Sequence, residues 1–251
     1  MRWHRFIQIE HESNVSIDGI PASQETGLMQ YKAIIFDLDG TLIDSMQLWR
    51  QVDVEFLTKR GIDVPADLFD SIPGGNGFTQ TALYFKERFG LDDSVESIMD
   101  EWTYMVEQHY SSDVILKEGV YELLQAIRKS DILMGLATSN SLHLARTVLQ
   151  ANGILSWFSA LSTGDMQLRG KPYPDIFLNC ARMLEVEPEA CLAIEDTLTG
   201  VQAAKAAGMR TFAIFDEDSI PFWEQIKKVA DLAFEDYTML SGQVLQELGL
   251  I

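Results

Sequence analysis

The stretch "KAIIFDLDGTLIDS", Lys32 to Ser45, places two aspartates one residue apart directly after an apolar run. A short apolar run that ends in Asp and Gly is typical of a strand buried on both faces of a parallel sheet. Two carboxylates this close repel each other, and strands are poor in Asp. Asp37 and Asp39 therefore indicate a function at the carboxyl end of this strand.

Further short apolar runs follow the first one, and helical patterns separate them. Residues 119–130 and 174–184 each place their apolar side chains on one face of a helix. Alternating strands and helices predict an α/β fold, with a doubly wound parallel sheet and right-handed crossovers. The later strands are predicted at Ile132–Thr138, Cys191–Asp196, Thr211–Phe215 and Ala230–Phe234.

The crossover after the first strand is too long for one helix and contains no convincing strand. It carries helical patterns at residues 47–61, 79–90 and 95–110, and the last has an apolar stripe that is typical of a helical core. An all-helical insert at this point predicts a small cap domain over the carboxyl ends of the strands, where ligands bind in open α/β sheets.

The domain boundaries follow from this insert. We expect a catalytic core formed by residues 29–45 and 114–251, and a helical cap formed by residues 46–113. Residues 1–28 show no clear period and are expected to be a loose arm or the product of an upstream start. Hinges for cap movement are predicted at residues 43–46 and 111–117.

Composition limits the partners and the compartment. Asp and Glu number 38 against 19 Lys and Arg, and a net charge of −19 disfavours a nucleic-acid backbone or an anionic membrane as partner. No apolar run approaches the roughly 18–20 residues of a spanning helix. The first residues carry charges where a signal peptide needs an apolar stretch. Cys180 and Cys191 lack pairing spacing and are expected to be reduced thiols. A cytoplasmic protein is expected.

Polar and charged side chains gather at the predicted carboxyl ends of the strands. An isolated Asp-x-Asp also occurs in turns, and an isolated Lys is usually a surface residue, so each signal alone is weak. The ordered set is specific: Asp37 and Asp39, then Thr138-Ser139-Asn140, then Lys171 in "LRGKPYPDIF", then Glu195-Asp196 in "AIEDT".

The charges of this set predict a metal. Four carboxylates give a formal charge of −4, which Lys171 reduces only to −3. A Mg²⁺ ion would bring the site to −1, and a proton on one carboxyl would bring it to zero. Mg²⁺ prefers oxygen ligands and is usually held by a few carboxylates and a substrate phosphate. We therefore expect a Mg²⁺ site and one carboxyl whose pKa is raised.

These motifs resemble those of the haloacid dehalogenase (HAD) superfamily. The resemblance lies in "DLDGT", the Thr-Ser pair after the second strand, "GKPYPDIF" and "EDTLTGVQAAKAAGM". The order of elements and the helical insert resemble the subgroup with an α-helical C1 cap, which contains β-phosphoglucomutase and many sugar-phosphate phosphatases. The resemblance covers roughly residues 29–235.

The resemblance implies that Asp37 is the nucleophile, which forms an aspartyl-phosphate, and that Asp39 is the general acid and base. Asp39 would protonate the leaving oxygen and then deprotonate the attacking water. Phosphoryl transfer through a carboxylate does need an acid within reach of the same phosphorus.

The remaining roles in the core are also implied by the resemblance. Lys171 would offset charge on the nucleophile and on the transferring phosphoryl group. The phosphate would be bound by Thr138, Ser139, Asn140 and Thr41. Mg²⁺ would be bound by Asp37, by Asp196, by Glu195 directly or through water, and by the backbone carbonyl of Asp39.

The cap is expected to select the substrate. The loop "PGGNGF", Pro73 to Phe78, should reach the site, which makes Gly75, Asn76 and Phe78 substrate-binding candidates. In β-phosphoglucomutases a cap arginine binds a second phosphate and a histidine in the first cap helix assists closure. Alignment puts Phe78 near the arginine and Trp49 near the histidine, and both offer apolar surface instead.

The sequence thus favours a Mg²⁺-dependent phosphatase that hydrolyses a small phosphorylated metabolite such as a sugar phosphate. A phosphosugar mutase is the alternative function. Arg50 or Lys86 could bind the second phosphate of a bisphosphate, although neither stands at the position of the cap arginine. A non-enzymatic receiver-type phosphoacceptor is disfavoured, since it has no acid at the position of Asp39 and no cap. A metal-free dehalogenase is disfavoured too, since it needs neither Asp39 nor the Glu195-Asp196 pair.

Overall fold

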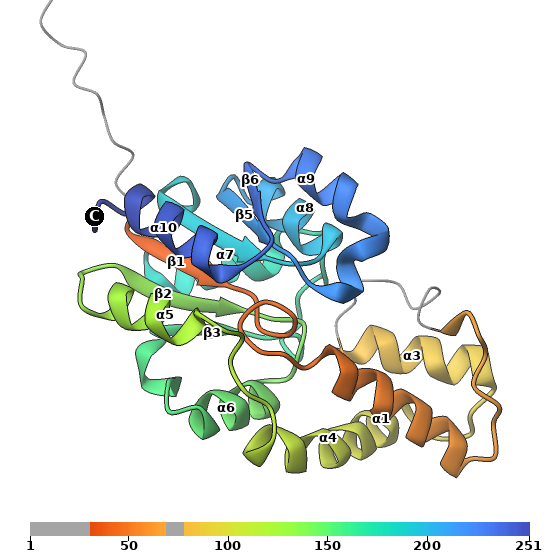
Figure 1. The fold of residues 1–251 in the computed structure, drawn as a ribbon. Helices are drawn as coiled ribbons and strands as arrows, with labels where there is room; N and C mark the ends of the chain where they lie inside the picture. The colour runs from red at the N-terminus through yellow and green to blue at the C-terminus, as the bar shows by residue number, and fades with distance from the viewer. Residues whose placement is uncertain (1–30, 69–77) are drawn as a thin grey trace, which may run out of the picture.

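The computed structural model describes residues 31–68 and 78–251, and its centre is one parallel sheet (Figure 1). The six strands lie in the order β3-β2-β1-β4-β5-β6, and every neighbouring pair is parallel. This confirms the predicted doubly wound fold. The strands are β1 (Ala33–Phe36), β2 (Leu133–Ala137), β3 (Ala160–Ser162), β4 (Cys191–Glu195), β5 (Arg210–Ile214) and β6 (Leu232–Phe234).

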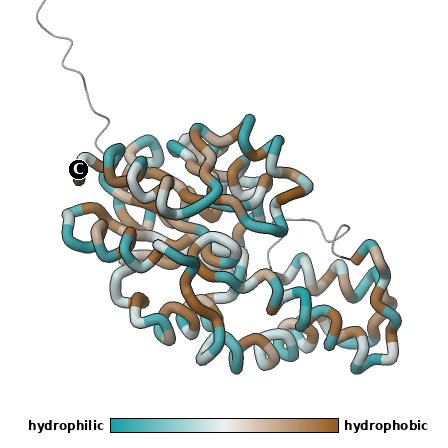
Figure 2. Tube along the Cα trace, viewed as in Figure 1, coloured by the Kyte–Doolittle hydropathy of each residue, from teal (hydrophilic) through white to brown (hydrophobic). Residues whose placement is uncertain are grey.

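Helices cover both faces of the sheet. One face carries α5 (Val120–Arg128), α6 (Leu142–Ala151) and α10 (Tyr237–Glu247), and these pack into the larger of the apolar clusters. The opposite face carries α7 (Asp175–Leu184), α8 (Leu198–Ala206) and α9 (Trp223–Val229). Figure 2 shows hydrophobic residues concentrated along the central strands, with mixed hydrophobic and hydrophilic positions on the surrounding helices.

The register of the strands places the predicted site residues next to one another at the carboxyl edge of the sheet. Phe36 of β1 pairs with Leu136 of β2 and with Ile194 of β4, so the residues that follow these three positions emerge together at the carboxyl edge. The strand order reverses between β1 and β4, and ligands of open α/β sheets bind in the crevice at such a reversal. Asp37 and Glu195 lie on its two sides.

The insert is helical in its described residues. It contains α1 (Met46–Lys59), α3 (Phe78–Phe89) and α4 (Val95–Ser112), which lie beyond the carboxyl end of the sheet in Figure 1. Its interior is aromatic: Phe56, Phe85 and Trp102 are fully buried and lie 5.0–6.1 Å apart between ring centroids. Among the described residues, no helix is both long enough and apolar enough to cross a bilayer.

The two linkers to the insert run side by side next to the first strand. The Asp44 amide donates to the Ile115 carbonyl at 3.2 Å, and the Lys117 amide donates to the Leu42 carbonyl at 2.9 Å. The Lys117 ammonium also donates to the Gly40 carbonyl at 2.6 Å. It therefore braces the turn that carries Asp37 and Asp39 at the place where the insert begins.

Candidate active site

Three carboxylates and one ammonium form a buried cluster at the switch point of the sheet. One oxygen each of Asp37, Glu195 and Asp196 lies within 4.8 Å of the other two. The Lys171 ammonium donates to Asp37 Oδ1 at 2.6 Å and to Glu195 Oε1 at 2.5 Å. All four residues are buried. Their formal charge is −2, because one ammonium faces three carboxylates.

The cluster has the electrostatics of a cation site. Burial raises the pKa of Asp37, and burial together with the charges of Glu195 and Asp37 raises the pKa of Asp196 well above its ordinary value. Burial lowers the pKa of Lys171, but its two carboxylate partners outweigh that effect and keep it protonated. Excess negative charge on buried oxygen ligands is what a hard divalent cation neutralises, so these residues fit Mg²⁺.

Glu195 and Asp196 differ in how many hydrogen bonds their carboxylate oxygens already accept. Glu195 Oε2 accepts from the amide and the hydroxyl of Thr197, at 2.6 and 2.9 Å. Asp196 Oδ1 accepts from the Thr41 hydroxyl at 2.7 Å, and Oδ2 has no hydrogen bond from any residue that the structure describes. The Thr41 hydroxyl, expected on the phosphate, is thus turned toward Asp196. Asp196 keeps an oxygen for a further ligand.

Two glycines make room for these carboxylates. Gly40 has a φ of +80°, and a Cβ atom there would lie 2.5 Å from Asp196 Oδ2. A Cβ atom at Gly200 would lie 1.7 Å from Glu195 Oε1. The atom that requires a glycine at position 200 is therefore an oxygen of a site carboxylate.

Asp39 lies apart from the carboxylate cluster and under the insert. Its Oδ1 accepts from the Ser45 hydroxyl at 2.6 Å, from Trp49 Nε1 at 3.1 Å and from the Tyr110 hydroxyl. Its Oδ2 accepts from Asn140 Nδ2 at 3.1 Å. These donors come from the linker, from α1, from α4 and from the segment after β2. Asp39 is therefore held by hydrogen bonds from four side chains and not by Lys171.

Tyr110 is a site residue that sequence reasoning missed. Its hydroxyl also accepts from Trp49 Nε1 at 3.0 Å and from Asn140 Nδ2 at 3.2 Å. Burial and the charge of Asp39 raise the pKa of Tyr110 well above its ordinary value, so the phenol stays protonated and donates to Asp39. A signal was present, because Tyr110 continues the apolar stripe of α4 four residues beyond Val106 and ends it with a polar group.

The segment after β2 joins the site to the insert. The Thr138 hydroxyl accepts from the Asn140 amide at 3.0 Å and donates to no residue that the structure describes. The Ser139 carbonyl accepts from the Phe78 amide at 3.3 Å, at the start of α3. The Thr138 hydroxyl thus keeps its own proton for a further acceptor, and Ser139 contacts the insert directly.

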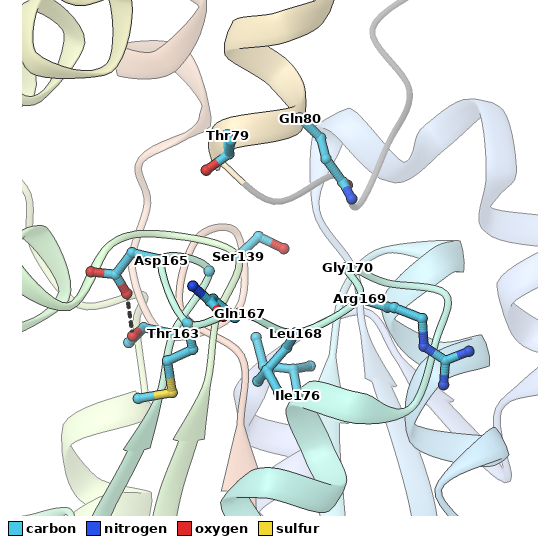
Figure 3. Close-up of a pocket in the computed structure, with 12 residues that line it drawn as sticks. Thr79, Gln80, Ser139, Thr163, Asp165, Gln167, Leu168, Arg169, Gly170 and Ile176 are labelled. Atoms are coloured by element: carbon cyan, nitrogen blue, oxygen red, sulfur yellow. Dashed lines mark hydrogen bonds between the residues drawn. The ribbon is translucent and has the colours of Figure 1, made fainter. Parts of the chain in front are cut away.

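A pocket of about 290 Å³ opens beside this contact (Figure 3). It lies between the start of α3 and the loop of residues 163–170, which directly precedes Lys171 in the chain. Arg169 points away from it in Figure 3 and pairs with Asp175 at 2.7 Å. The side chains that face it include the uncharged polar groups of Thr79, Gln80, Ser139, Thr163 and Gln167.

The structure places two of the insert residues that were predicted to bind substrate. Trp49 and Phe78 are neighbours, with ring centroids 5.9 Å apart. Trp49 contributes its N–H to Asp39 in addition to the apolar surface that was expected. Gly75 and Asn76 lie outside the described residues, as do the other residues of 73–77 and the N-terminal residues 1–28.

A capped α/β hydrolase with an aspartate-based site is the class that this fold and this cluster define. The sequence profile of the haloacid dehalogenase-like hydrolases matches residues 31–208. Hexitol phosphatase B of Escherichia coli strain K12 is 30% identical over 190 residues, covering 74% of this chain and 84% of that protein. N-acetylmuramic acid 6-phosphate phosphatase of Pseudomonas putida is 26% identical, covering 74% and 83%.

The solved structure of CbbY from Rhodobacter sphaeroides in complex with phosphate superposes with a TM-score of 0.75 at 25% identity. The match covers 83% of this chain and 95% of that one. The chain belongs to the haloacid dehalogenase-like hydrolase family. It is an enzyme of the phosphoric monoester hydrolase class.

Proposed function

We propose that the protein is a Mg²⁺-dependent phosphatase of a small sugar or sugar-alcohol monophosphate. The observation that carries the proposal is the separation of two carboxyl groups that are one residue apart. Asp37 lies in the buried cluster against Lys171, while Asp39 lies outside it among four hydrogen-bond donors. One carboxylate faces a cation site and the other faces the insert, which suits a nucleophile and a general acid.

In the proposed first step, an Asp37 oxygen attacks phosphorus and forms an aspartyl-phosphate, and the bond from phosphorus to the leaving oxygen breaks. Asp39 enters this step protonated and gives its proton to that oxygen, so the alcohol leaves neutral and Asp39 is left as a carboxylate. In the second step Asp39 takes a proton from water, which attacks the same phosphorus and releases inorganic phosphate and the Asp37 carboxylate. Mg²⁺ would be held by Asp37 and Asp196 and would supply positive charge against the phosphate oxygens.

The surrounding residues stabilise charge during both steps. Lys171 neutralises one of the charges on the nucleophile's side of the site at 2.6 Å from Asp37. Thr138 donates its free hydroxyl proton to a phosphate oxygen, and the Ser139 amide lies beside it. Asn140 holds Asp39 through Nδ2 at 3.1 Å.

The charges of the insert favour hydrolysis over transfer between two positions of a sugar. A mutase needs a cation for the second phosphate of a bisphosphate. Arg50 bonds to Asp218 at 2.7 Å, and Lys86 donates to the carbonyls of Leu91 and Asp93. The Arg and Lys residues of the described part of the insert are all engaged with carboxylate, carbonyl or hydroxyl oxygens: Arg50, Lys59, Arg60, Lys86 and Arg88.

A screen of phosphate monoesters tests the function. We expect release of inorganic phosphate from sugar and sugar-alcohol monophosphates with Mg²⁺, and loss of that activity in excess EDTA with recovery on adding Mg²⁺. Supplying β-glucose 1-phosphate with a trace of the 1,6-bisphosphate separates the alternatives. Glucose 6-phosphate formed much faster than phosphate is released from any tested substrate would contradict hydrolysis, and full activity in excess chelator would remove the metal.

The two acidic residues of β4 should contribute unequally to the metal site. Asp196→Ala is expected to raise the Mg²⁺ concentration for half-maximal activity more than Glu195→Ala does, because Glu195 is already bonded to Lys171 and Thr197. Titrating activity with Mg²⁺ in both variants and the wild type measures the difference. Equal shifts, or a larger shift in Glu195→Ala, would assign the direct ligand to Glu195.

Tyr110→Phe should slow the reaction although the substitution keeps the ring. The variant loses one of the four hydrogen bonds that hold Asp39, and we expect kcat to fall by roughly tenfold, the effect of one hydrogen bond to a charged group. Tyr104→Phe on the same helix is the matched control, because Tyr104 is 70% exposed. Kinetics of Tyr110→Phe that match those of Tyr104→Phe would show that the hydroxyl plays no part in positioning Asp39.

A further inference from the structure

Asp53 is a buried carboxyl group that the proposed reaction does not use. It lies on α1, four residues after Trp49, and only 9% of it is exposed. It has no hydrogen bond or ion pair with any residue in 31–68 or 78–251. An unpartnered carboxyl costs stability when it is buried. Such a group calls for a functional explanation.

Aromatic rings border the helix face from which Asp53 projects. Trp49 and Phe56 flank it at spacings of four and three residues, which places all three on one face of α1. The ring of Trp49 lies 5.9 Å from that of Phe78, Phe78 lies 5.8 Å from Trp102, and Trp102 lies 5.4 Å from Phe56. The four rings therefore form a continuous series of contacts from Trp49, which precedes Asp53 on α1, to Phe56, which follows it.

Two polar groups of this aromatic cluster are unsatisfied. Burial raises the pKa of Asp53 to about 7, and no charged neighbour contributes to the shift. Trp102 Nε1 is a buried donor without a hydrogen-bond partner among the residues that the structure describes. An unused acceptor and an unused donor are the complement of a hydroxyl group, which both donates and accepts.

The cluster adjoins the place where the leaving group must lie. Trp49 Nε1 is 3.1 Å from Asp39 Oδ1, and Asp39 is the proposed donor to the leaving oxygen. Asp53 follows one turn later, and four residues of helix rise about 6 Å. A leaving group of several carbons that starts at Asp39 and runs along α1 therefore comes within reach of Asp53.

The charges around this path exclude an anionic leaving group. Asp39 and Asp53 are both acidic, and the basic residues of the described part of the insert are bonded elsewhere. A second phosphate or a carboxylate on the substrate would meet like charge without compensation. A carbon chain that carries hydroxyl groups meets an acceptor and aromatic faces.

We infer that Asp53 is a specificity-determining residue, which accepts a hydrogen bond from a hydroxyl of an uncharged, polyhydroxylated leaving group. This inference rests on the proposed phosphatase function and names the substrate class of the same site.

The test compares kcat/KM for sorbitol 6-phosphate with kcat/KM for phenyl phosphate, whose leaving group has no further hydroxyl. In Asp53→Leu the ratio is expected to fall by roughly ten- to a hundredfold, the effect of losing a hydrogen bond to a charged group. Glu55→Gln, on the exposed side of the same helix, should keep the wild-type ratio. The urea midpoint of Asp53→Leu should rise, because an unpartnered buried carboxyl is removed.

Asp53→Asn keeps the shape of the side chain and serves if the Leu variant does not fold. Its ratio should fall less, and its activity on phosphoglycolate relative to sorbitol 6-phosphate should rise, because the repelling charge is gone. An unchanged ratio in both variants would overturn the inference, as would a lower urea midpoint with the ratio unchanged. A preference for glucosamine 6-phosphate that disappears in Asp53→Asn would overturn the uncharged class. No hydrolysis of any ester by the wild type would instead refute the proposed function.

Discussion

Asp37→Asn is expected to lower kcat by roughly four orders of magnitude or more, as the loss of a catalytic nucleophile does in other enzymes. The amide oxygen of Asn is a weak nucleophile and cannot form the aspartyl-phosphate. The measurement is release of inorganic phosphate at saturating substrate and Mg²⁺. Retention of a tenth or more of the wild-type rate would refute covalent catalysis at this residue.

The fold should survive this substitution. Asn keeps an oxygen that can accept from Lys171, and the formal charge of the cluster changes from −2 to −1. We therefore expect a urea midpoint equal to or above that of the wild type. Asp44→Asn is the matched control, since Asp44 lies in the same segment with an exposed side chain, and it should retain full activity. A loss of both stability and activity in Asp37→Asn would leave the catalytic role unsupported.

The parts of the fold that were predictable are those that local patterns determine. A buried strand and an amphipathic helix each leave their period in a few consecutive residues. β1, β2, β4, β5 and the buried faces of α5 and α7 were therefore found to within two residues at most ends. β3 was missed, because three residues at the edge of a sheet contain no apolar run and are strand only through pairing with β2.

The site divides in the same way. Asp37 and the Glu195-Asp196 pair were predicted because each follows or ends a recognisable strand, and the register of a parallel sheet brings such positions together. Lys171 was predicted from its place in the loop before the helix of residues 174–184. Asp39 was expected to share their cluster. Its place is decided by partners that are distant in sequence, and Tyr110 lies 71 residues away.

The burial of Asp53 also could not be predicted from the sequence. In the sequence it is one acidic residue on a helix that also carries Glu55, and spacing alone does not separate them. The structure separates them by burial, because Asp53 faces the aromatic interior of the insert and Glu55 faces solvent. Burial of an individual polar residue depends on how three helices pack, and no local pattern records it.

Lys171→Met should have the second largest effect, on stability as well as on activity. Removing one partner of a buried ion pair costs about 3–5 kcal/mol, because the other charges are left without compensation. In this cluster Asp37 and Glu195 lose the one ammonium that pairs with them among the described residues. At pH 7.5 without divalent cations, we expect the free energy of unfolding of Lys171→Met to be lower than that of the wild type by about 3–5 kcal/mol. We also expect the variant to lose phosphatase activity. Lys228→Met, at an exposed position of α9, is the control.

The pH dependence identifies the cause of the loss. Burial already raises the pKa values of Asp37 and Asp196 in the folded state, and removing the Lys171 charge raises the pKa of Asp37 further. Between the unfolded and the folded pKa, the folded state holds protons that the unfolded state has released, so stability falls as pH rises. Urea unfolding at pH 5.5 should therefore recover part of the stability that Lys171→Met loses at pH 7.5.

Mg²⁺ gives the same test without changing pH. If the cation binds the carboxylates of the folded state, it should stabilise Lys171→Met as well as the wild type, and its binding must offset the charge that the lysine carried. Equal stability of Lys171→Met and Lys228→Met at pH 7.5 would mean that the buried carboxylates are not held by Lys171. If the stability of Lys171→Met recovers at pH 5.5 but not in Mg²⁺, the cation does not bind to these carboxylates. Recovery in both conditions is the outcome that the cluster predicts, because a proton and a divalent cation neutralise the same oxygens.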